Sequence, residues 1–338
     1  MKKRFPGKRQ QEKRKRAVKE IARLFRTEKS FLIIGHVRPD GDTVGSALAI
    51  GSWLGAEGRR VKVVNADNTP QYLMFLKGAK RIKRIHGFSE LKNGYDVCIV
   101  LECPDVLRIG FPFEKERFKK TIIIDHHPYG KKGIKDGVEF IDPRASSCAE
   151  LVWDIMEAAG HKVTRDEAVC LYTGILTDTG KFQYENTTGH TLHAAAAMVD
   201  RGVDPVTLYQ KLYVNKTLSG LRLLGGTLSS LKVDGKVAYL SVTDAVLKKH
   251  NASDEDTEGI IHYAGLLKGI GLFVMFRELR NPRGTVKVSL RSYGKINANR
   301  LAGIFGGGGH IRASGFQIKG TVKRVIPKVL SVLKRYAV

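Results

Sequence analysis

Short apolar runs alternate with longer segments of helical periodicity over the first 200 residues. The apolar runs predict buried strands at 31–35, 61–65, 97–101 and 121–124, with a weaker edge strand at 81–85. The intervening periodicity predicts helices at 14–26, 43–57, 147–159, 166–176 and 188–201. Strands that alternate with helices indicate a parallel sheet with right-handed crossovers. The predicted fold class is therefore α/β, with a Rossmann-like first domain.

The pattern weakens between 203 and 230, where Pro205 and several glycines interrupt it, so we predict a domain linker there. Beyond it we expect strands at 236–242, 271–277, 285–292 and 315–318, and helices at 255–268, 296–304 and 324–336. This alternation predicts a smaller α/β domain with a mixed sheet. The predicted organisation is a basic tail over 1–16, a first domain over 17–202, the linker, and a second domain over 231–338.

Polar residues follow three of the strands of the first domain, at the point where each strand ends. They are His36, Asp40 and Asp42 after the first strand, Glu102 after 97–101, and Asp125, His126 and His127 after 121–124. In an open α/β sheet, ligands bind at the carboxyl ends of the strands, so these side chains are candidates for one site. Carboxylates with imidazoles suit Mn²⁺, and to a lesser extent Mg²⁺, better than a soft metal.

The number of acidic side chains indicates two metal ions rather than one. Packing these carboxylates together without cations would be strongly repulsive. Two divalent ions about 3.5–4 Å apart, joined by a bridging carboxylate, remove the repulsion and can generate hydroxide at neutral pH. Phosphoester hydrolysis is the reaction class that such a pair supports.

The chain is strongly basic, with 58 Lys and Arg against 33 Asp and Glu and a formal net charge of +25. Residues 1–16 contribute nine Lys or Arg against Glu12, a local net of +8, so most of the excess lies on the predicted folded body. Such a surface attracts polyanions, and nucleic acids or nucleotides are the simplest partners. The alternative is a solvated, Lys- and Arg-rich surface of the kind found in some heat-adapted proteins.

The cysteine spacing and the hydropathy of the chain indicate the cellular compartment in which the protein is expected. The four cysteines lie at no C-x-x-C spacing, which favours buried thiols in a reducing compartment over disulfides or structural zinc. No apolar run approaches the ~18 residues of a membrane span, and the basic N-terminus lacks the apolar core of a signal peptide. We therefore expect a cytoplasmic protein with no membrane partner.

Several segments, in chain order, resemble the motifs of the DHH phosphoesterase superfamily. The loop from His36 to Asp42 resembles the first motif, and Asp125-His126-His127 resembles the signature third motif. The segment Leu176-Thr177-Asp178-Thr179-Gly180 resembles the fourth motif, and the GGGGH run at 306–310 resembles an element of the DHH-associated domain. Motifs found in this order make the resemblance specific, whereas a lone Asp-His-His would not.

The resemblance implies roles for individual residues of the first domain. One metal ion would be held by His36, Asp40 and Glu102, and the other by Asp42, Glu102, His126 and Asp178, with Glu102 as the bridge. Asp125 would orient His126 from behind. His127 would contact the scissile phosphate or assist the leaving oxygen.

The resemblance also implies a substrate site that uses both domains. Arg291, His310 and the amides of Gly307, Gly308 and Gly309 would bind the far phosphate or terminal nucleotide, with Arg108 helping from the first domain. The site would lie in a cleft between the domains, so that the linker could act as a hinge.

One position departs from the superfamily pattern. The second motif usually supplies Asp, whereas this chain has Glu102 in Leu101-Glu102-Cys103-Pro104-Asp105. A small backbone shift could absorb the extra methylene; alternatively Asp105 takes part, or the metals sit differently and activity is altered.

Short two-domain members are similar to the oligoribonuclease and pAp-phosphatase branch, the nanoRNases. The expected substrates are therefore short RNA oligonucleotides, hydrolysed to mononucleotides, and pAp. Soluble phosphodiesterases of cyclic di-AMP, or of its linear product pApA, share the same two domains and form the first alternative. A catalytically weak nucleotide- or RNA-binding protein is the alternative of a different class, and a second copy of the chain is a further candidate partner.

Overall fold

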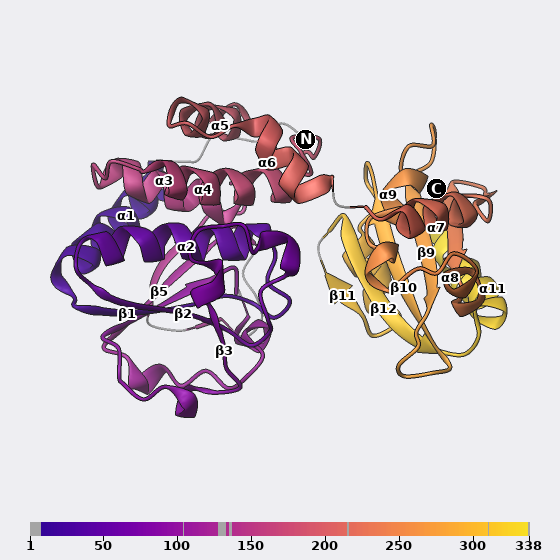
Figure 1. Ribbon diagram of the computed structural model, residues 1–338, viewed down its shortest axis with the longest axis horizontal. Helices are drawn as coiled ribbons and strands as arrows, with labels where there is room; N and C mark the ends of the chain where they lie inside the picture. The colour runs from indigo at the N-terminus through magenta and orange to yellow at the C-terminus, as the bar shows by residue number, and fades with distance from the viewer. Residues whose placement is uncertain are drawn as a thin grey trace. The chain divides into compact units, whose positions relative to one another are not determined.

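The computed structural model describes residues 8–103, 105–127, 133–134, 137–214, 216–309 and 311–336. The chain divides into two compact units, Met1–Asn215 and Lys216–Val338, each with its own sheet (Figure 1). Each unit therefore has to be understood from its own core.

The sheet of the first unit is parallel throughout, in the order β3-β2-β1-β4-β5-β6. Its strands are β1 (Ser30–Ile34), β2 (Arg60–Asn65), β3 (Lys83–Arg84), β4 (Val97–Leu101), β5 (Lys120–Asp125) and β6 (Val138–Ile141). The three central strands are buried along almost their whole length because both faces of the sheet are covered. The parallel α/β fold predicted from the apolar runs is confirmed, although β6, a short edge strand, gave no clear signal.

The described residues of this unit form the α-helices α1 (Lys8–Thr27), α2 (Gly41–Ala56), α3 (Cys148–Ala158), α4 (Arg165–Asp178), α5 (Gly189–Asp200) and α6 (Pro205–Tyr213). Short 3₁₀ helices lie at Gln71–Leu73, Ala79–Arg81, Phe88–Glu90, Val106–Ile109 and Lys115–Arg117. Figure 1 shows α1 to α4 on one side of the sheet. The opposite side is packed with a cluster around Phe88, whose ring contacts three other phenylalanine rings edge to face.

Helices α2 and α4 approach one another closely because glycines lie at their contact. A Cβ on Gly45 of α2 would lie 2.3 Å from the carbonyl oxygen of Cys170, and one on Gly174 of α4 would lie 2.7 Å from Asp42 Oδ1. Only glycine fits at these two positions without moving a helix. The contact matters for the site because α2 begins, and α4 ends, beside the predicted metal ligands.

The second unit has a mixed sheet in the order β11-β12-β10-β9-β8-β7, as predicted, with only β8 and β9 parallel among its described pairs. Its strands are β7 (Lys232–Asp234), β8 (Val237–Val242), β9 (Leu272–Glu278), β10 (Thr285–Ser292), β11 (Gly308–Gly309) and β12 (Ala313–Lys319). Its helices are α7 (Leu218–Leu228), α8 (Asp244–Lys249), α9 (Ile260–Ala264), α10 (Ala298–Gly303) and α11 (Val322–Leu333), with 3₁₀ turns at Glu255–Thr257 and Lys334–Tyr336.

The range 203–230 is more ordered than its sequence pattern indicates. Helix α6 buries Leu208 and Leu212 in the first unit, and α7 buries Leu223 in the second. The glycines of α7 weaken its helical propensity, and burial of one apolar face overrides that preference. Across the described residues, no helix combines the length and apolar character needed to cross a bilayer.

Candidate metal centre

The carboxyl edge of the first sheet delivers most of the predicted ligands. His36 follows β1 by two residues, Glu102 follows β4 directly, and His126 follows β5 directly. Asp40 is the N-cap of α2, and its Oδ1 accepts hydrogen bonds from the backbone N–H groups of Asp42 (3.1 Å) and Thr43 (3.0 Å). That cap fixes the loop after β1, so the side chains of this segment converge instead of alternating.

A first group of potential metal ligands comprises His36, Asp40 and Glu102. Nε2 of His36 lies 3.7 Å from Asp40 Oδ2 and 3.6 Å from Glu102 Oε2. One ligand atom from each of the three residues lies within 4.8 Å of the other two, so a single cation could contact all of them.

A second group comprises Asp42, His126 and Asp178, which again offer atoms within 4.8 Å of one another. Nε2 of His126 lies 3.4 Å from Asp178 Oδ2 and 3.9 Å from Asp42 Oδ2. This nitrogen is buried and has no hydrogen-bond partner. A buried imidazole nitrogen that faces carboxylates without bonding to them is well placed to bind a cation between them.

Glu102 connects the two groups. Its Oε1 lies 3.4 Å from Nε2 of His126, while its Oε2 faces His36 and accepts a hydrogen bond from Thr43 Oγ1. The residue is 1% exposed and has a backbone φ of +54°, in the left-handed region that a glutamate adopts only when its surroundings require it. Each carboxylate oxygen therefore faces a different imidazole, as a bridging ligand would require.

Crowding of the carboxylates changes their protonation. Burial, together with the charges of Glu102 and Asp178, raises the pKa of Asp42 well above its ordinary value. Burial also raises the pKa of Asp178, to about 7, against the opposing effect of His126. Burial opposes ionisation of Glu102 too, but the His126 and His36 imidazoles that face its two oxygens hold its pKa well below the usual range. Divalent cations would relieve this repulsion, so the residues present fit a metal centre.

Asp42 also has a second attachment. Its Oδ2 accepts a hydrogen bond from the backbone N–H of Cys148 (2.6 Å), and its Oδ1 accepts one from that of Ala149 (2.8 Å). These amides form the N-terminus of α3, where a negative charge is stabilised. Asp42 therefore joins the cluster to the helical layer.

The prediction that Asp125 orients His126 is wrong. Asp125 Oδ1 accepts a hydrogen bond from the backbone N–H of His127 and lies 2.8 Å from His127 Nδ1. His127 directly follows His126, and the two imidazole rings lie with their centres 4.5 Å apart and their planes tilted by 56°. Asp125 therefore fixes His127, whose Nε2 lies 3.5 Å from Arg108 Nη1. Arg108 thus lies beside His127, and its role in substrate binding stays a prediction. His127 also forms a group of potential ligands with Glu102 and His126.

Comparison with known proteins identifies this arrangement. Residues 30–175 match the model of the DHH family, N-terminal domain, and residues 234–338 match the DHHA1 domain. A bifunctional oligoribonuclease and PAP phosphatase NrnA from Thermus thermophilus is 33% identical over 95% of this chain and 94% of its own length. The chain belongs to the DHH family. The superfamily membership predicted from the motifs is thereby confirmed.

Other relatives of this DHH family member agree on the fold. NrnA of Bacillus subtilis is 27% identical over 88% of the chain and 92% of its own length. The cyclic-di-AMP phosphodiesterase GdpP of the same organism is 25% identical, but the match covers only 49% of GdpP. A crystal structure of an exopolyphosphatase-related protein from Bacteroides fragilis has a TM-score of 0.86 at 28% identity, over 96% of this chain and 97% of that one.

Glu102, and not Asp105, lies among the potential ligand groups of this DHH protein in the part of the chain that the structure describes. Asp105 is half-buried and caps the 3₁₀ helix at Val106–Ile109 through a hydrogen bond from the backbone N–H of Leu107 (3.1 Å). It belongs to none of the ligand groups found among the described residues. The longer Glu102 side chain spans both groups from its own backbone position.

The second unit carries its predicted substrate residues on the two strands that flank β12. Arg291 lies on β10 opposite Ala313 of β12, and Gly309 of β11 pairs with Ser314 of β12. Gly308 and Gly309 are exposed, while a Cβ on Gly307 would lie 2.3 Å from the carbonyl oxygen of Gly315. The glycine run thus also serves packing against β12. His310, predicted to bind substrate, lies outside the described residues.

Two supporting residues were missed from the sequence. Thr43 donates its hydroxyl hydrogen bond to Glu102, and Asn186 donates from Nδ2 to the backbone oxygens of Asp178 (3.1 Å) and Ser146 (2.8 Å). Thr43 adjoins the first motif, which was its only signal. Asn186 lies in a turn eight residues beyond Asp178, and nothing in the local pattern marks it.

Proposed function

We propose that this protein hydrolyses short oligoribonucleotides to mononucleotides and also removes the 3′-phosphate from pAp. The observation that carries the proposal is Glu102, whose two oxygens face the His36 and His126 imidazoles of adjacent ligand groups. A pair of cations joined by one carboxylate suits phosphoester hydrolysis. Similarity to NrnA proteins over nearly the whole chain supports RNA oligonucleotides and pAp as the substrates.

We assign one cation to His36, Asp40 and Glu102, and the other to Asp42, Glu102, His126 and Asp178. This oxygen-rich set with two imidazoles favours Mn²⁺, with Mg²⁺ as the alternative. When bound, the two ions lower the pKa of water and neutralise charge on the phosphoryl oxygens. Asn186 holds the backbone that presents Asp178, and Thr43 holds the carboxylate of Glu102.

The chain's own residues would orient the substrate beside this centre. Asp125 fixes the ring of His127, so that its Nε2 is presented on the side of Arg108. Arg108 would bind a phosphoryl oxygen, and His127 would hydrogen-bond the phosphate or supply a proton to the leaving oxygen. In the second unit, Arg291 and the exposed amides of Gly308 and Gly309 would bind a phosphate group.

The similarity to GdpP favours a second candidate, hydrolysis of cyclic di-AMP or of linear pApA. Both candidate reactions hydrolyse a phosphoester bond, so the residues of the metal cluster do not distinguish between them. We expect the enzyme to act in the cytoplasm, because its four cysteines are free and buried, as in proteins of reducing compartments.

The test is Mn²⁺-dependent hydrolysis of 5′-labelled RNAs from dimers to about 20 nucleotides, with pAp, pApA and cyclic di-AMP alongside. We expect rates to be highest for the shortest RNAs, with measurable release of phosphate from pAp. Faster turnover of the cyclic compound would replace the proposal with the second candidate. An Asp178→Asn variant should be inactive in every assay, which excludes a contaminating nuclease. RNA binding without turnover by the wild type would instead indicate a binding protein.

A further inference from the structure

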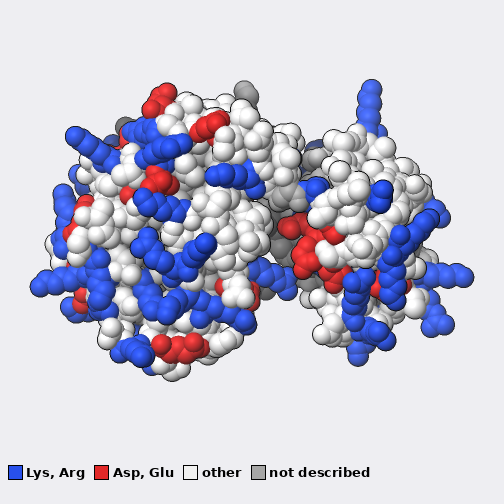
Figure 2. All heavy atoms as spheres, viewed as in Figure 1, with Lys and Arg blue, Asp and Glu red and all other residues white. Residues whose placement is uncertain are grey.

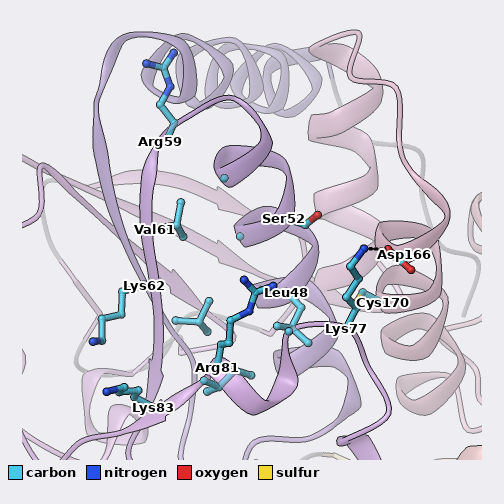
Figure 3. A pocket seen from close by; sticks show the side chains of 15 residues that line it. Leu48, Ser52, Arg59, Val61, Lys62, Lys77, Arg81, Lys83, Asp166 and Cys170 are labelled. Carbon is cyan, nitrogen blue, oxygen red and sulfur yellow. Dashed lines mark hydrogen bonds and ion pairs between the residues drawn. The ribbon is translucent and has the colours of Figure 1, made fainter.

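A basic groove lies on the first unit, away from the metal centre, along the outer edge of β2. It has a volume of about 520 Å³, which is large enough for a nucleotide. One wall is α2, at Leu48, Gly51, Ser52 and Gly55; the other is formed by the edge of β2 and the segment that leads into β3. Figure 3 shows Arg59 at one end of this groove, and Lys62, Arg81 and Lys83 toward the other.

The cations of the groove differ in their partners. Among the described residues, Asp166 is the only acidic side chain that lines the groove, and it forms an ion pair with Lys77. Arg59 donates from Nη2 to the backbone oxygen of Arg26 (2.7 Å). Within the described parts of the chain, Lys62, Arg81 and Lys83 have no ion-pair partner. Three unpaired cations from two separate segments therefore border the groove, with Arg81 inside it and Lys62 and Lys83 on the side that it shares with a second hollow, and together they attract anions.

A second hollow continues the groove and shares Lys62 and Lys83 with it. This hollow has a volume of about 410 Å³ and adds Arg84, Lys92 and Tyr95 to the lining, with Glu90 as its acidic member. The Arg60 guanidinium lies 4.5 Å from the centre of the Tyr95 ring. Two hollows joined by shared lysines suit an extended polyanion better than a single compact ion. Lys and Arg predominate over this face of the unit in Figure 2.

The backbone at the groove is also partly open. Strand β3 pairs with β2 only at Val64 and Asn65, so the residues from Arg60 to Val63 pair on one side alone, with β1. Lysine on such an edge is a common guard against unwanted strand pairing. That role requires only Lys62 on the edge itself, whereas Arg81 and Lys83 come from another segment and still face the same hollow.

We propose that this groove binds the phosphate backbone of single-stranded RNA at a site separate from the metal centre. Apolar Val61, Leu48 and Ile82 line the first hollow, and Tyr95 lines the second, so bases as well as phosphates find partners. The groove lining on α2 begins at Leu48, six residues after Asp42, which places its near end about 9 Å from Asp42 along the helix axis. The site therefore goes beyond the proposed hydrolysis and does not depend on it.

The test compares two triple variants of the whole protein. The groove variant carries Lys62→Gln, Arg81→Gln and Lys83→Gln. The matched control carries Lys19→Gln, Lys120→Gln and Lys162→Gln, which removes the same charge from exposed positions of the same unit outside both hollows. Fluorescence anisotropy would measure binding of a labelled RNA of about 12 nucleotides in EDTA, between about 50 and 200 mM salt. Thermal unfolding would check that both variants fold.

We expect the groove variant to bind RNA at least about tenfold more weakly, and the slope of log affinity against log salt to fall by about 2, because three phosphate contacts are lost. The control should bind within about twofold of the wild type. Equal weakening in both variants, or no effect of the groove variant, would overturn the proposal. Displacement of the RNA by polyglutamate of equal charge, at equal concentration, would show that the groove binds acidic polypeptide instead.

Turnover of a diribonucleotide should be the same in all three proteins, because no groove residue contacts the metal cluster. This measurement separates the two proposals. Absence of turnover in the wild type would count against the proposed hydrolysis and leave the binding comparison intact.

Discussion

The two ends of helix α2 border regions of opposite charge. At its first turn, Asp40 and Asp42 join a buried cluster in which every acidic group has a defined neighbour. Along its last turns, Ser52 and Gly55 border an open groove whose cations are largely unpaired. The acidic end is organised by strand ends and helix caps, and the basic end by an uncovered strand edge.

The difference shows how one helix can serve two kinds of recognition. Buried charges need fixed partners because desolvation is costly, so the acidic end can hold an ion only in one geometry. Exposed cations keep their hydration and tolerate many arrangements of phosphates. We therefore expect substitutions at the acidic end to have large, specific effects, and substitutions at the basic end to have graded, salt-dependent ones.

The largest effect is expected at Glu102. Glu102→Gln keeps the length of the side chain but removes the charge that faces both imidazoles, so turnover should fall by at least about 100-fold. Glu102→Asp retains the charge and should keep turnover within about tenfold of the wild type. Steady-state rates with saturating Mn²⁺ check both. A fully active Gln variant would show that Glu102 bridges nothing.

The second test uses the two ends of α2 directly. Gly45→Ala places a methyl group against the Cys170 carbonyl oxygen and should lower the free energy of unfolding by about 1–3 kcal/mol, with loss of turnover as α2 and α4 separate. Gly55→Ala is the matched control: its Cβ would meet no atom within 4 Å, so it should stabilise by up to about 1 kcal/mol. Urea unfolding measures both. Similar effects at the two positions would contradict the close contact of α2 with α4.

A third test separates two acids of the cluster. Asp42→Asn loses one of two hydrogen bonds to the N-terminus of α3 and should cost about 1–3 kcal/mol of unfolding free energy in EDTA. Asp178→Asn removes a carboxylate whose pKa burial raises to about 7, so its ionised form opposes folding and the variant should be at least as stable as the wild type above pH 7 in EDTA. Both variants should lose turnover. Equal destabilisation would mean that Asp42 does not anchor α3.

The smallest effect is expected at an acid on the opposite edge of the same sheet. Hydrogen bonds from Lys119 and from the Ser30 hydroxyl lower the pKa of Asp96 to about 2. Because the pKa is lower in the folded than in the unfolded state, the stabilisation is fully present above about pH 4 and is lost as the pH falls toward 2. Asp96→Asn should therefore lower the melting temperature by about 1–2 °C at pH 6 and by nothing near pH 2. A difference that persists at pH 2 would mean that the carboxylate charge is not its cause.

The sequence by itself determined the architecture and the members of the cluster. Buried strands of a parallel sheet have uninterrupted apolar sequences, so the apolar runs that begin at Phe31, Val97 and Ile122 predict β1, β4 and β5. Their shared direction places the residues that follow them at one edge. His36, Glu102 and His126 could therefore be brought together before any contact was known.

Tertiary structure alone decided which of these side chains face one another. Asp125 binds His127 rather than His126 because the direction of a side chain beyond a strand end depends on local backbone angles, which periodicity does not encode. The left-handed backbone conformation of Glu102 and the hydrogen bonds that anchor Asp42 on α3 likewise depend on tertiary packing and not on the sequence pattern. The groove is assembled from α2, the edge of β2 and the segment before β3, and a hollow between separate segments exists only once their packing is fixed.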